Sequence, residues 1–308
     1  MVKKVRQRSD GEERGNLYAE VTNRIIAELE AGRFPWVQPW GSAKGELGLP
    51  KNAATGRTYS GINILILWGA VIEGGYAGQH WLTFRQALAL GGSVRKGEHG
   101  TTVFYADRFI PKEAAAQAAE TGEEPEVVAF LKRFTVFNVA QCEGLPEERF
   151  ATPPLPEREI VPAAEALISA TGADFRIGGD RAFYVPSVDF IQVPPRPAFF
   201  DQINYYRTCF HELGHWTGHP ARLARDLSGA RGSHPCAREE LVAELSSAFL
   251  CATLGIVPTV RHADYLRSWL EVLREDNRAI FRAASQASRA ADFILECRKT
   301  AETQGEAA

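Results

Sequence analysis

Two histidines and a glutamate between residues 205 and 219 have the spacing of a metal site. His211 and His215 are four residues apart, so on a helix their imidazoles project from the same face, with Glu212 beside them. This HExxH pattern typically binds zinc through both imidazoles and uses the glutamate as a general base. The competing interpretation, two histidines on an ordinary surface helix, fits poorly with the apolar residues around them.

A catalytic zinc needs a third protein ligand, which must come from another part of the chain. A longer HExxHxxGxxH pattern would place it at position 221, but that residue is Ala221. Residues 237–250 form an apolar helical pattern in which Glu240 and Glu244 share a face. We predict Glu244 as the third ligand, because it lies deeper in the apolar run, where a carboxylate is costly unless it is bound or paired. Glu240 is then an acceptor for a ligand histidine, or the alternative third ligand.

This donor set predicts a gluzincin-like zinc metallopeptidase, with another divalent cation such as Mn²⁺ as the alternative metal. Zinc lowers the pKa of a bound water towards neutrality, and Glu212 would take its proton before attack on a peptide carbonyl. A group that stabilises the resulting oxyanion should stand nearby. The candidates are Tyr205, Tyr206, His219 and His234.

The elements that must position these residues can be predicted from periodicity. Apolar residues from Ile203 onward, with Gly218 and Pro220 as stop signals, predict a helix that carries the motif. Before it, residues 174–177, 182–186 and 189–193 predict short strands, whose edge could receive an extended peptide. Helices that complete a domain are predicted at residues 163–170, before these strands, and at residues 262–274 and 276–295, after the motif helix.

The first half of the chain interleaves aromatic and basic residues on short elements. We predict helices at 17–31, 64–72 and 81–88, two strands between 94 and 105, and a strand at 133–139. Residues 44–110 hold seven Lys or Arg against four Asp or Glu. Rings that stack on bases and cations that meet phosphates suit single-stranded nucleic acid. The candidate contacts are Trp36, Trp40, Lys51, Arg57, Tyr59, Trp81, Arg85, Arg95 and Lys96. The competing interpretation is that the tryptophans pack over a small core.

The chain, at 308 residues, is long enough for two domains, and the pattern of elements predicts an α+β fold. Four prolines between positions 143 and 159 mark the boundary between the two domains. The predicted organisation is a disordered arm at 1–15, a single-stranded DNA-binding domain at 16–145, a proline-rich linker at 146–157, a metallopeptidase domain at 158–299 and a tail at 300–308.

Composition places few limits on function. A net charge of -3 gives no global sign of a nucleic-acid partner. The longest apolar run, 64–72, is too short to span a bilayer, and the polar N-terminus has no signal-peptide pattern. Five scattered cysteines without CxxC spacing argue against a disulfide framework and a cysteine metal site. We therefore expect a cytoplasmic protein with no membrane partner.

Spaced motifs along most of the chain resemble the ArdC-type antirestriction proteins. These motifs are 29–32 (LEAG), 35–36 and 39–40 (PW twice), 52–57 (NAATGR), 59–63 (YSGIN), 95–98 (RKGE), 135–138 (TVFN), 211–219 and 239–244. The resemblance implies an N-terminal single-stranded DNA-binding domain joined to a zincin-like metallopeptidase domain. It further implies a protein carried by conjugative plasmids or other mobile elements that helps incoming DNA escape host restriction.

Two other functions remain open at this point. The protein could be primarily a zinc peptidase that cleaves a regulatory or restriction protein, with the N-terminal domain recognising that substrate. It could also be a binding module whose metal only stabilises the fold.

Overall fold

The computed structural model describes residues 6–36, 48–109, 128–146, 161–199, 203–230, 232–257 and 265–305. Helix α1 (Arg6–Glu30) includes most of the predicted disordered arm, and helix α9 (Ala279–Gly305) continues through most of the predicted tail. Residues 6–15 and 300–305 are therefore helical, whereas the sequence predicted a disordered arm and a polar tail there. The predicted linker lies outside the described residues except for Pro146. None of the helices in these ranges combines the length and apolar character that a bilayer span requires.

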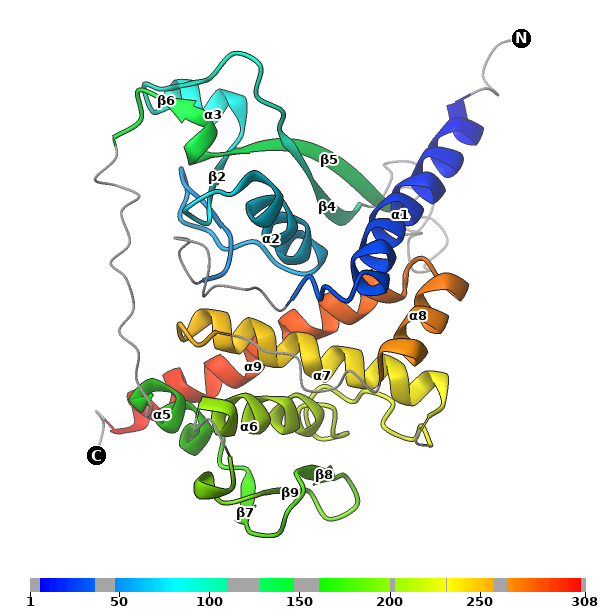
Figure 1. Ribbon diagram of the computed structural model, residues 1–308, viewed down its shortest axis with the longest axis vertical. Helices are drawn as coiled ribbons and strands as arrows, with labels where there is room; N and C mark the ends of the chain where they lie inside the picture. The colour runs from blue at the N-terminus through cyan, green and yellow to red at the C-terminus, as the bar shows by residue number, and fades with distance from the viewer. Residues whose placement is uncertain are drawn as a thin grey trace, which may run out of the picture.

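The N-terminal half contains a four-stranded sheet packed on helix α2 (Ile62–Gly74). Its strands are β1 (Lys51–Asn52), β2 (His80–Leu82), β5 (Val128–Asn138) and β4 (Thr101–Phe109), in that order. β1 and β2 are parallel and the other pairs are antiparallel. Because side chains alternate along a strand, Val103 and Val136 share the face that packs on Leu67 and Val71 of α2. Figure 1 shows the long β4–β5 ribbon beside α2.

The remaining strands of this half form a second, smaller sheet. The two strands predicted between residues 94 and 105 do not pair with each other. Instead, β3 (Ser93–Val94) pairs with β6 (Cys142–Glu143), whereas β4 pairs with β5. A short 3-10 turn, η1 (Val139–Gln141), connects β5 to β6.

The segment after residue 80 is a strand followed by a helix, not the single helix that the sequence predicted. Trp81 lies in β2, and helix α3 (Phe84–Ala89) begins three residues later. Thr83 caps this helix, since its hydroxyl accepts a hydrogen bond from the Gln86 N–H at 3.3 Å. The Gln86 side chain accepts one in return from the Thr83 N–H at 2.9 Å. This reciprocal cap fixes the helix start, which leaves Trp81 in the sheet and Phe84 in the first turn.

The C-terminal half is mostly helical, as predicted. It contains α5 (Pro162–Ala170), α6 (Ile203–Trp216), α7 (His234–Thr253), α8 (Leu266–Glu275) and α9. Strands β7 (Asp174–Ile177), β8 (Phe183–Val185) and β9 (Phe190–Val193) form a sheet of order β7-β9-β8. A 3-10 turn, η3 (Arg196–Ala198), follows β9. β8 is an edge of this sheet, and it contacts α6.

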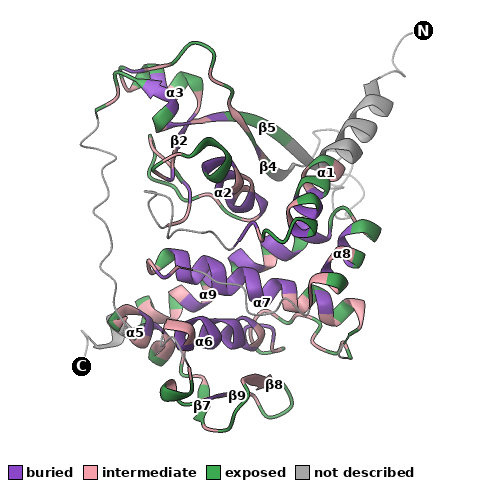
Figure 2. Ribbon diagram, in the orientation of Figure 1, coloured by how far each residue is buried: buried purple, intermediate pink, exposed green. Residues whose placement is uncertain are grey.

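One hydrophobic core joins the two halves. The ring of Trp68 on α2 lies 5.8 Å from that of Phe249 on α7, and the ring of Trp36 lies 5.7 Å from that of Trp269 on α8. All four rings are almost completely buried. In Figure 2 the buried residues of α2, α6, α7 and α9 line the middle of the molecule. Apolar burial is the main favourable contribution to folding, so each half stabilises the other.

Candidate metal centre

The site forms where α6 and α7 pack against each other in opposite directions. His211 of α6 lies opposite Glu240 of α7. One turn before His211, the Arg207 carbonyl accepts a hydrogen bond at 3.0 Å from the hydroxyl of Ser247, which comes after Glu240. The two helices therefore run antiparallel. The helices approach closely because Gly214 has no side chain. A Cβ atom at Gly214 would lie 3.0 Å from the Cα of Ala243.

Three side chains from these helices form a group that could hold a metal ion. Nε2 of His211 lies 3.5 Å from Glu240 Oε2, and Nε2 of His215 lies 3.7 Å from Glu240 Oε1. The candidate ligand atoms of the three residues all lie within 4.8 Å of one another. Two imidazoles and one carboxylate are donors that suit a divalent transition metal. The residues present therefore fit such an ion.

Glu244, the third ligand that the sequence predicted, does not belong to this group; Glu240, the alternative, does. Both glutamates share a face of α7, but Glu240 is level with the histidines and Glu244 is one turn further along. Because α6 runs in the opposite direction, that extra turn carries Glu244 towards Arg207 and Cys251. The choice between the two glutamates therefore depends on the relative register of two packed helices, which the pattern of α7 alone does not contain.

Glu239 holds one histidine in position. Its Oε1 lies 3.2 Å from Nδ1 of His215, the ring nitrogen on the side away from Glu240. Arg225 donates to both carboxylate oxygens of Glu239, at 2.8 and 3.0 Å, and also to the Gly214 carbonyl at 2.6 Å. A carboxylate that accepts from the second ring nitrogen fixes the tautomer and orientation of a metal-ligating histidine. Neither Glu239 nor Arg225 was among the predicted site residues, because no local metal-binding motif marks either of them.

Glu212 is buried beside the two histidines. Burial raises the pKa of its carboxyl group to about 7, and the Tyr184 backbone amide of β8 donates a hydrogen bond to it. A carboxyl group with a pKa near neutrality can both accept and release a proton. The contact also places the edge strand β8 directly beside the candidate general base.

A second arginine attaches β8 to the end of α6. Arg222 forms an ion pair with Asp189, and its guanidinium lies 3.2 Å from the hydroxyl of Tyr184. Tyr184 donates to Asp189 at 2.8 Å, and Arg222 lies over the ring of Trp216 at 3.9 Å. From one loop, Arg222 thus reaches Tyr184 of β8, and Arg225 reaches Glu239 of α7. Ala224 between them has a φ of 48°, a left-handed conformation that allows this change of direction.

The candidates for oxyanion stabilisation have different surroundings. Tyr205 and Tyr206 are buried in the shared hydrophobic core, and the Tyr206 hydroxyl accepts from the Val161 N–H. His234 begins α7 and pairs with Glu275 of α8 at 3.1 Å. His219 lies near Asp189 in the loop after α6. Of the four candidates, His219 is the one adjacent to the Arg222 contacts.

Two of the predicted DNA contacts are core residues. Trp36 and Trp81 are 0% exposed, and Trp81 packs on Tyr76. Neither ring can stack on a base in this conformation, so the packing interpretation is correct for both. Tyr59 is half-buried, packs beside that core and has its pKa raised by burial. Trp40 lies outside the described residues.

The predicted basic contacts are exposed. Lys51, Arg57, Arg85, Arg95 and Lys96 all have exposed side chains. Arg95 is already engaged, because it pairs with Glu98 at 3.0 Å and donates to the carbonyl of Ala140.

An exposed aromatic residue that was not among the predicted contacts lies next to these cations. Phe84, in the first turn of α3, is 51% exposed and precedes Arg85. The Asn52 side chain donates to Gln86 at 3.1 Å, which holds the turn that carries Arg57 beside α3. The Thr83–Gln86 capping pattern was the signal that could have found Phe84, since it predicts that the helix begins there.

Comparisons with known proteins give matches to both halves. A model described as the N-terminal domain of the anti-restriction factor ArdC matches residues 15–137, and one described as a zincin-like metallopeptidase matches residues 162–286. The uncharacterized protein y4eC of Sinorhizobium fredii (strain NBRC 101917 / NGR234) is 43% identical over 282 residues, which cover 91% of each chain. The DNA primase TraC of Escherichia coli is 40% identical over 296 residues, which cover 90% of this chain and 27% of TraC.

Crystal structures of the antirestriction ArdC protein from plasmid R388 share the fold. The metal-free structure has a TM-score of 0.77 and the Mn(II)-bound structure one of 0.75; both are 40% identical, with 92% of this chain and 98% of that chain covered. The match, the zincin-like half and the group of His211, His215 and Glu240 together support a divalent metal. With both halves matched in order and nearly all of a solved member covered, the chain belongs to the ArdC-type family of antirestriction proteins.

Proposed function

We propose that this protein binds single-stranded DNA through its N-terminal half and protects DNA that enters a cell from restriction. The family membership, and relatives that include a protein of plasmid R388, support a role in a mobile element. The observation that carries DNA binding is Phe84, a large exposed ring next to an exposed arginine. Bases of a single strand stack on such rings, and phosphates meet the neighbouring cations.

We define the aromatic-basic surface as Lys51, Arg57, Phe84, Arg85 and Arg133. β1 and α3 are adjacent to β2, and the Asn52–Gln86 hydrogen bond connects the turn after β1 to α3. Arg133 is exposed and shares a face of β5 with Phe137, which packs with Ala87 of α3. The surface therefore combines one stacking ring with four cations that belong to neighbouring elements.

The test is binding of fluorescent oligonucleotides to the double variant Phe84→Ala, Arg85→Ala. Loss of one stacked base and one phosphate contact should weaken single-strand affinity by about tenfold or more at low salt. Leu88→Ala is the matched control, because Leu88 is equally exposed on α3 but has no ring. If the double variant bound as tightly as Leu88→Ala, the aromatic-basic surface would not be the DNA site.

We further propose that the C-terminal half hydrolyses a peptide bond in a protein substrate, with zinc as the expected metal. His211, His215 and Glu240 would hold the ion, which supplies activation of a water molecule and of a carbonyl group. Glu212 would accept the proton at its carboxylate, which the Tyr184 amide keeps in place. The edge strand β8 offers backbone groups to an extended peptide beside Glu212. The carrying observation is that His211, His215 and Glu240 converge on one group, with the buried Glu212 next to His211 in the chain.

The test is Glu212→Gln, which preserves shape but removes the base. Proteomic comparison of cells that carry wild type or variant should show cleavage products only with wild type, while metal content stays equal. Identical product sets would exclude hydrolysis by Glu212. The same variant in a conjugation assay separates the two activities, because protection that depends on DNA binding alone should survive it.

A further inference from the structure

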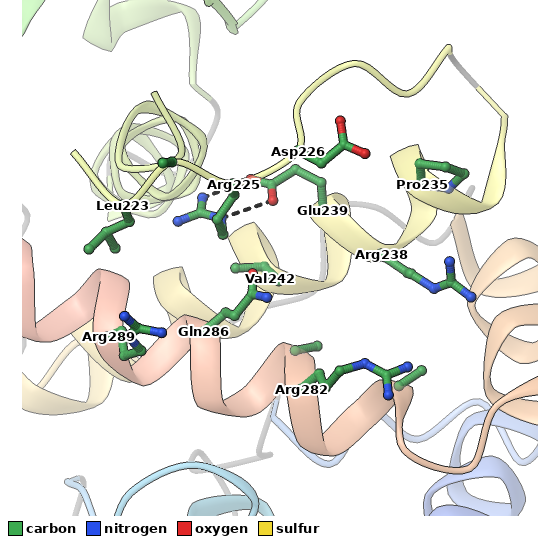
Figure 3. Close-up of a pocket in the computed structure, with 13 residues that line it drawn as sticks. Leu223, Arg225, Asp226, Pro235, Arg238, Glu239, Val242, Arg282, Gln286 and Arg289 are labelled. Atoms are coloured by element: carbon green, nitrogen blue, oxygen red, sulfur yellow. Dashed lines mark hydrogen bonds and ion pairs between the residues drawn. The ribbon is translucent and has the colours of Figure 1, made fainter. Parts of the chain in front are cut away.

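A cavity of about 380 Å³ lies between α7, α9 and the loop after α6. Its lining includes Glu239, which orients His215, but none of the three residues of the metal group. Figure 3 shows the bonds between Arg225 and Glu239, with Arg238, Arg282 and Arg289 among the other side chains that line the cavity. This space is therefore separate from the candidate metal centre and adjoins the residue that supports it.

The walls come from single faces of two helices. α9 contributes Arg282, Gln286 and Arg289, whose spacing of four and three residues places them on one face. α7 contributes Pro235, Arg238 and Val242, again separated by three and four residues. Small side chains on α9, among them Ala283, leave room between the helices. Seven of the thirteen lining residues are charged or polar, four of them arginines, and the other six are small or apolar.

The charges of the lining do not cancel. Its carboxylates are Glu239, already bonded to Arg225 and His215, and Asp226, which accepts from the amide and hydroxyl of Ser228. The lining also contains four arginines, and of these only Arg225 pairs with a lining carboxylate, that of Glu239.

The remaining three arginines also line the cavity. Arg282 pairs with Asp276, which does not line the cavity. Arg238 and Arg289 are exposed, and Arg289 forms no ion pair with any carboxylate in the described part of the chain. Asp276 offsets part of the charge of Arg282 and Arg238 from outside the lining. The guanidinium charge that remains around the cavity favours an anion inside it.

We propose that this cavity binds a terminal phosphate carried on a body of nucleotide size. A guanidinium group binds phosphate through two parallel N–H bonds, and several arginines match the two charges of a phosphomonoester. Cavities of ~300 Å³ or more hold small organic ligands, so the space exceeds the needs of a phosphate alone. Leu223, Pro235 and Val242 offer apolar contact to a sugar or base. A free mononucleotide and the 5′ end of a DNA strand share this chemistry. The inference does not depend on the aromatic-basic surface.

Calorimetric titrations of the full chain distinguish the sources. The probes are inorganic phosphate, deoxythymidine monophosphate, deoxythymidine, and one oligonucleotide with and without a 5′ phosphate. Tighter binding of the monophosphate than of deoxythymidine or inorganic phosphate identifies a free nucleotide as a sufficient ligand. An advantage confined to the phosphorylated oligonucleotide identifies a strand end. Equal binding of phosphate and monophosphate would contradict recognition of a nucleotide-sized body.

The double variant Arg238→Gln, Arg289→Gln tests the location. Both side chains are exposed, so the fold should be retained, and thermal unfolding checks this. We expect at least a tenfold loss of affinity for the phosphorylated probe that binds. Arg267→Gln is the matched control, an exposed arginine on α8 outside the cavity, and should bind like wild type. No phosphate-dependent binding at millimolar probe, or the same affinity in wild type and double variant, would overturn the proposal.

Discussion

Two glutamates one turn apart on α7 have different surroundings in the structure. Glu240 faces both candidate ligand nitrogens of α6, whereas Glu244 is buried in the region of Cys251. The carboxylate of Glu240 completes the group of candidate metal ligands, whereas that of Glu244 is buried between α6 and α7. Single substitutions therefore separate metal binding from packing.

Glu240→Gln should weaken divalent metal binding by about a hundredfold or more, because a neutral amide oxygen is a poorer metal ligand than a carboxylate. Loss of a direct ligand should lower metal affinity more than loss of a residue that only orients a ligand. Glu244→Gln is the matched control and should keep wild-type metal affinity. Competitive titration of Zn²⁺ and Mn²⁺ against a chromophoric chelator measures both. The reverse result, with affinity lost only in Glu244→Gln, would restore the assignment that the sequence favoured.

The Asp189 contacts predict a pH dependence of stability. The hydrogen bonds from Arg222 lower the pKa of Asp189 below its ordinary 3.8. A carboxylate with a lowered pKa stabilises the fold above its unfolded pKa, and that contribution is lost as pH falls through the folded value. Asp189→Asn should therefore be less stable than wild type at pH 7, and the difference should shrink below about pH 4. Urea unfolding of both proteins between pH 3 and 7 measures it; a difference that stayed constant would exclude the ion pair as its cause.

At the scale of elements, the contact between α6 and α7 decides the geometry of the centre. Gly214 lies between the two histidines and meets Ala243, which lies between the two glutamates. The absence of a side chain at this point sets the distance between helix axes, and through it the reach of Glu240.

Gly214→Ala should lower the free energy of unfolding by about 1–3 kcal/mol, because the new methyl group overpacks the contact with Ala243. Metal affinity should fall with it, as the helices move apart. Gly69→Ala in α2 is the control: its Cβ would meet only the end of Arg24 at 3.8 Å. Alanine has the better helix propensity, so that variant should gain up to ~1 kcal/mol. Chemical denaturation and metal titration of both variants measure these effects. A Gly214→Ala variant with wild-type stability and metal affinity would contradict the prediction.

Local patterns contained most of the elements but not their contacts. The strands before α6 and the helices after it follow from periodicity, and the motif places His211, Glu212 and His215 on one helix. Which carboxylate meets them depends on a glycine in one helix and an alanine in another. The burial of Trp81 depends on its pairing with Asn138, far away in the sequence. Periodicity describes one element at a time, so it cannot supply either fact.

At the scale of the whole molecule, the two halves share one core rather than a thin interface. Trp68 of α2 is buried against Phe249 of α7, and its ring nitrogen donates to the Gly48 carbonyl at 3.1 Å. The Gly61 amide at the start of α2 donates to the Ser288 hydroxyl of α9 at 2.9 Å. Polar and apolar contacts thus both cross between the halves.

Because of this core, we expect one cooperative unfolding transition for both halves. Trp68→Ala should lower its stability by about 3–5 kcal/mol, as for other large-to-small changes in a core. Phe84→Ala, an exposed aromatic truncation, should change stability by less than about 0.5 kcal/mol. Added metal at a hundred times its Kd should stabilise the whole transition by about 2.7 kcal/mol. Calorimetry with two separate transitions, only one of them moved by metal, would refute a common core.

The core shared by the two halves has a consequence for how the gene can recombine. A crossover that parted the halves would leave Trp36, Trp68 and Phe249 facing water on the two fragments, each prone to aggregate. We therefore expect the two halves to be exchanged together, as one unit. The alignment with TraC agrees with this expectation, because 90% of this chain, including residues of both halves, aligns with a part of TraC that makes up 27% of its length.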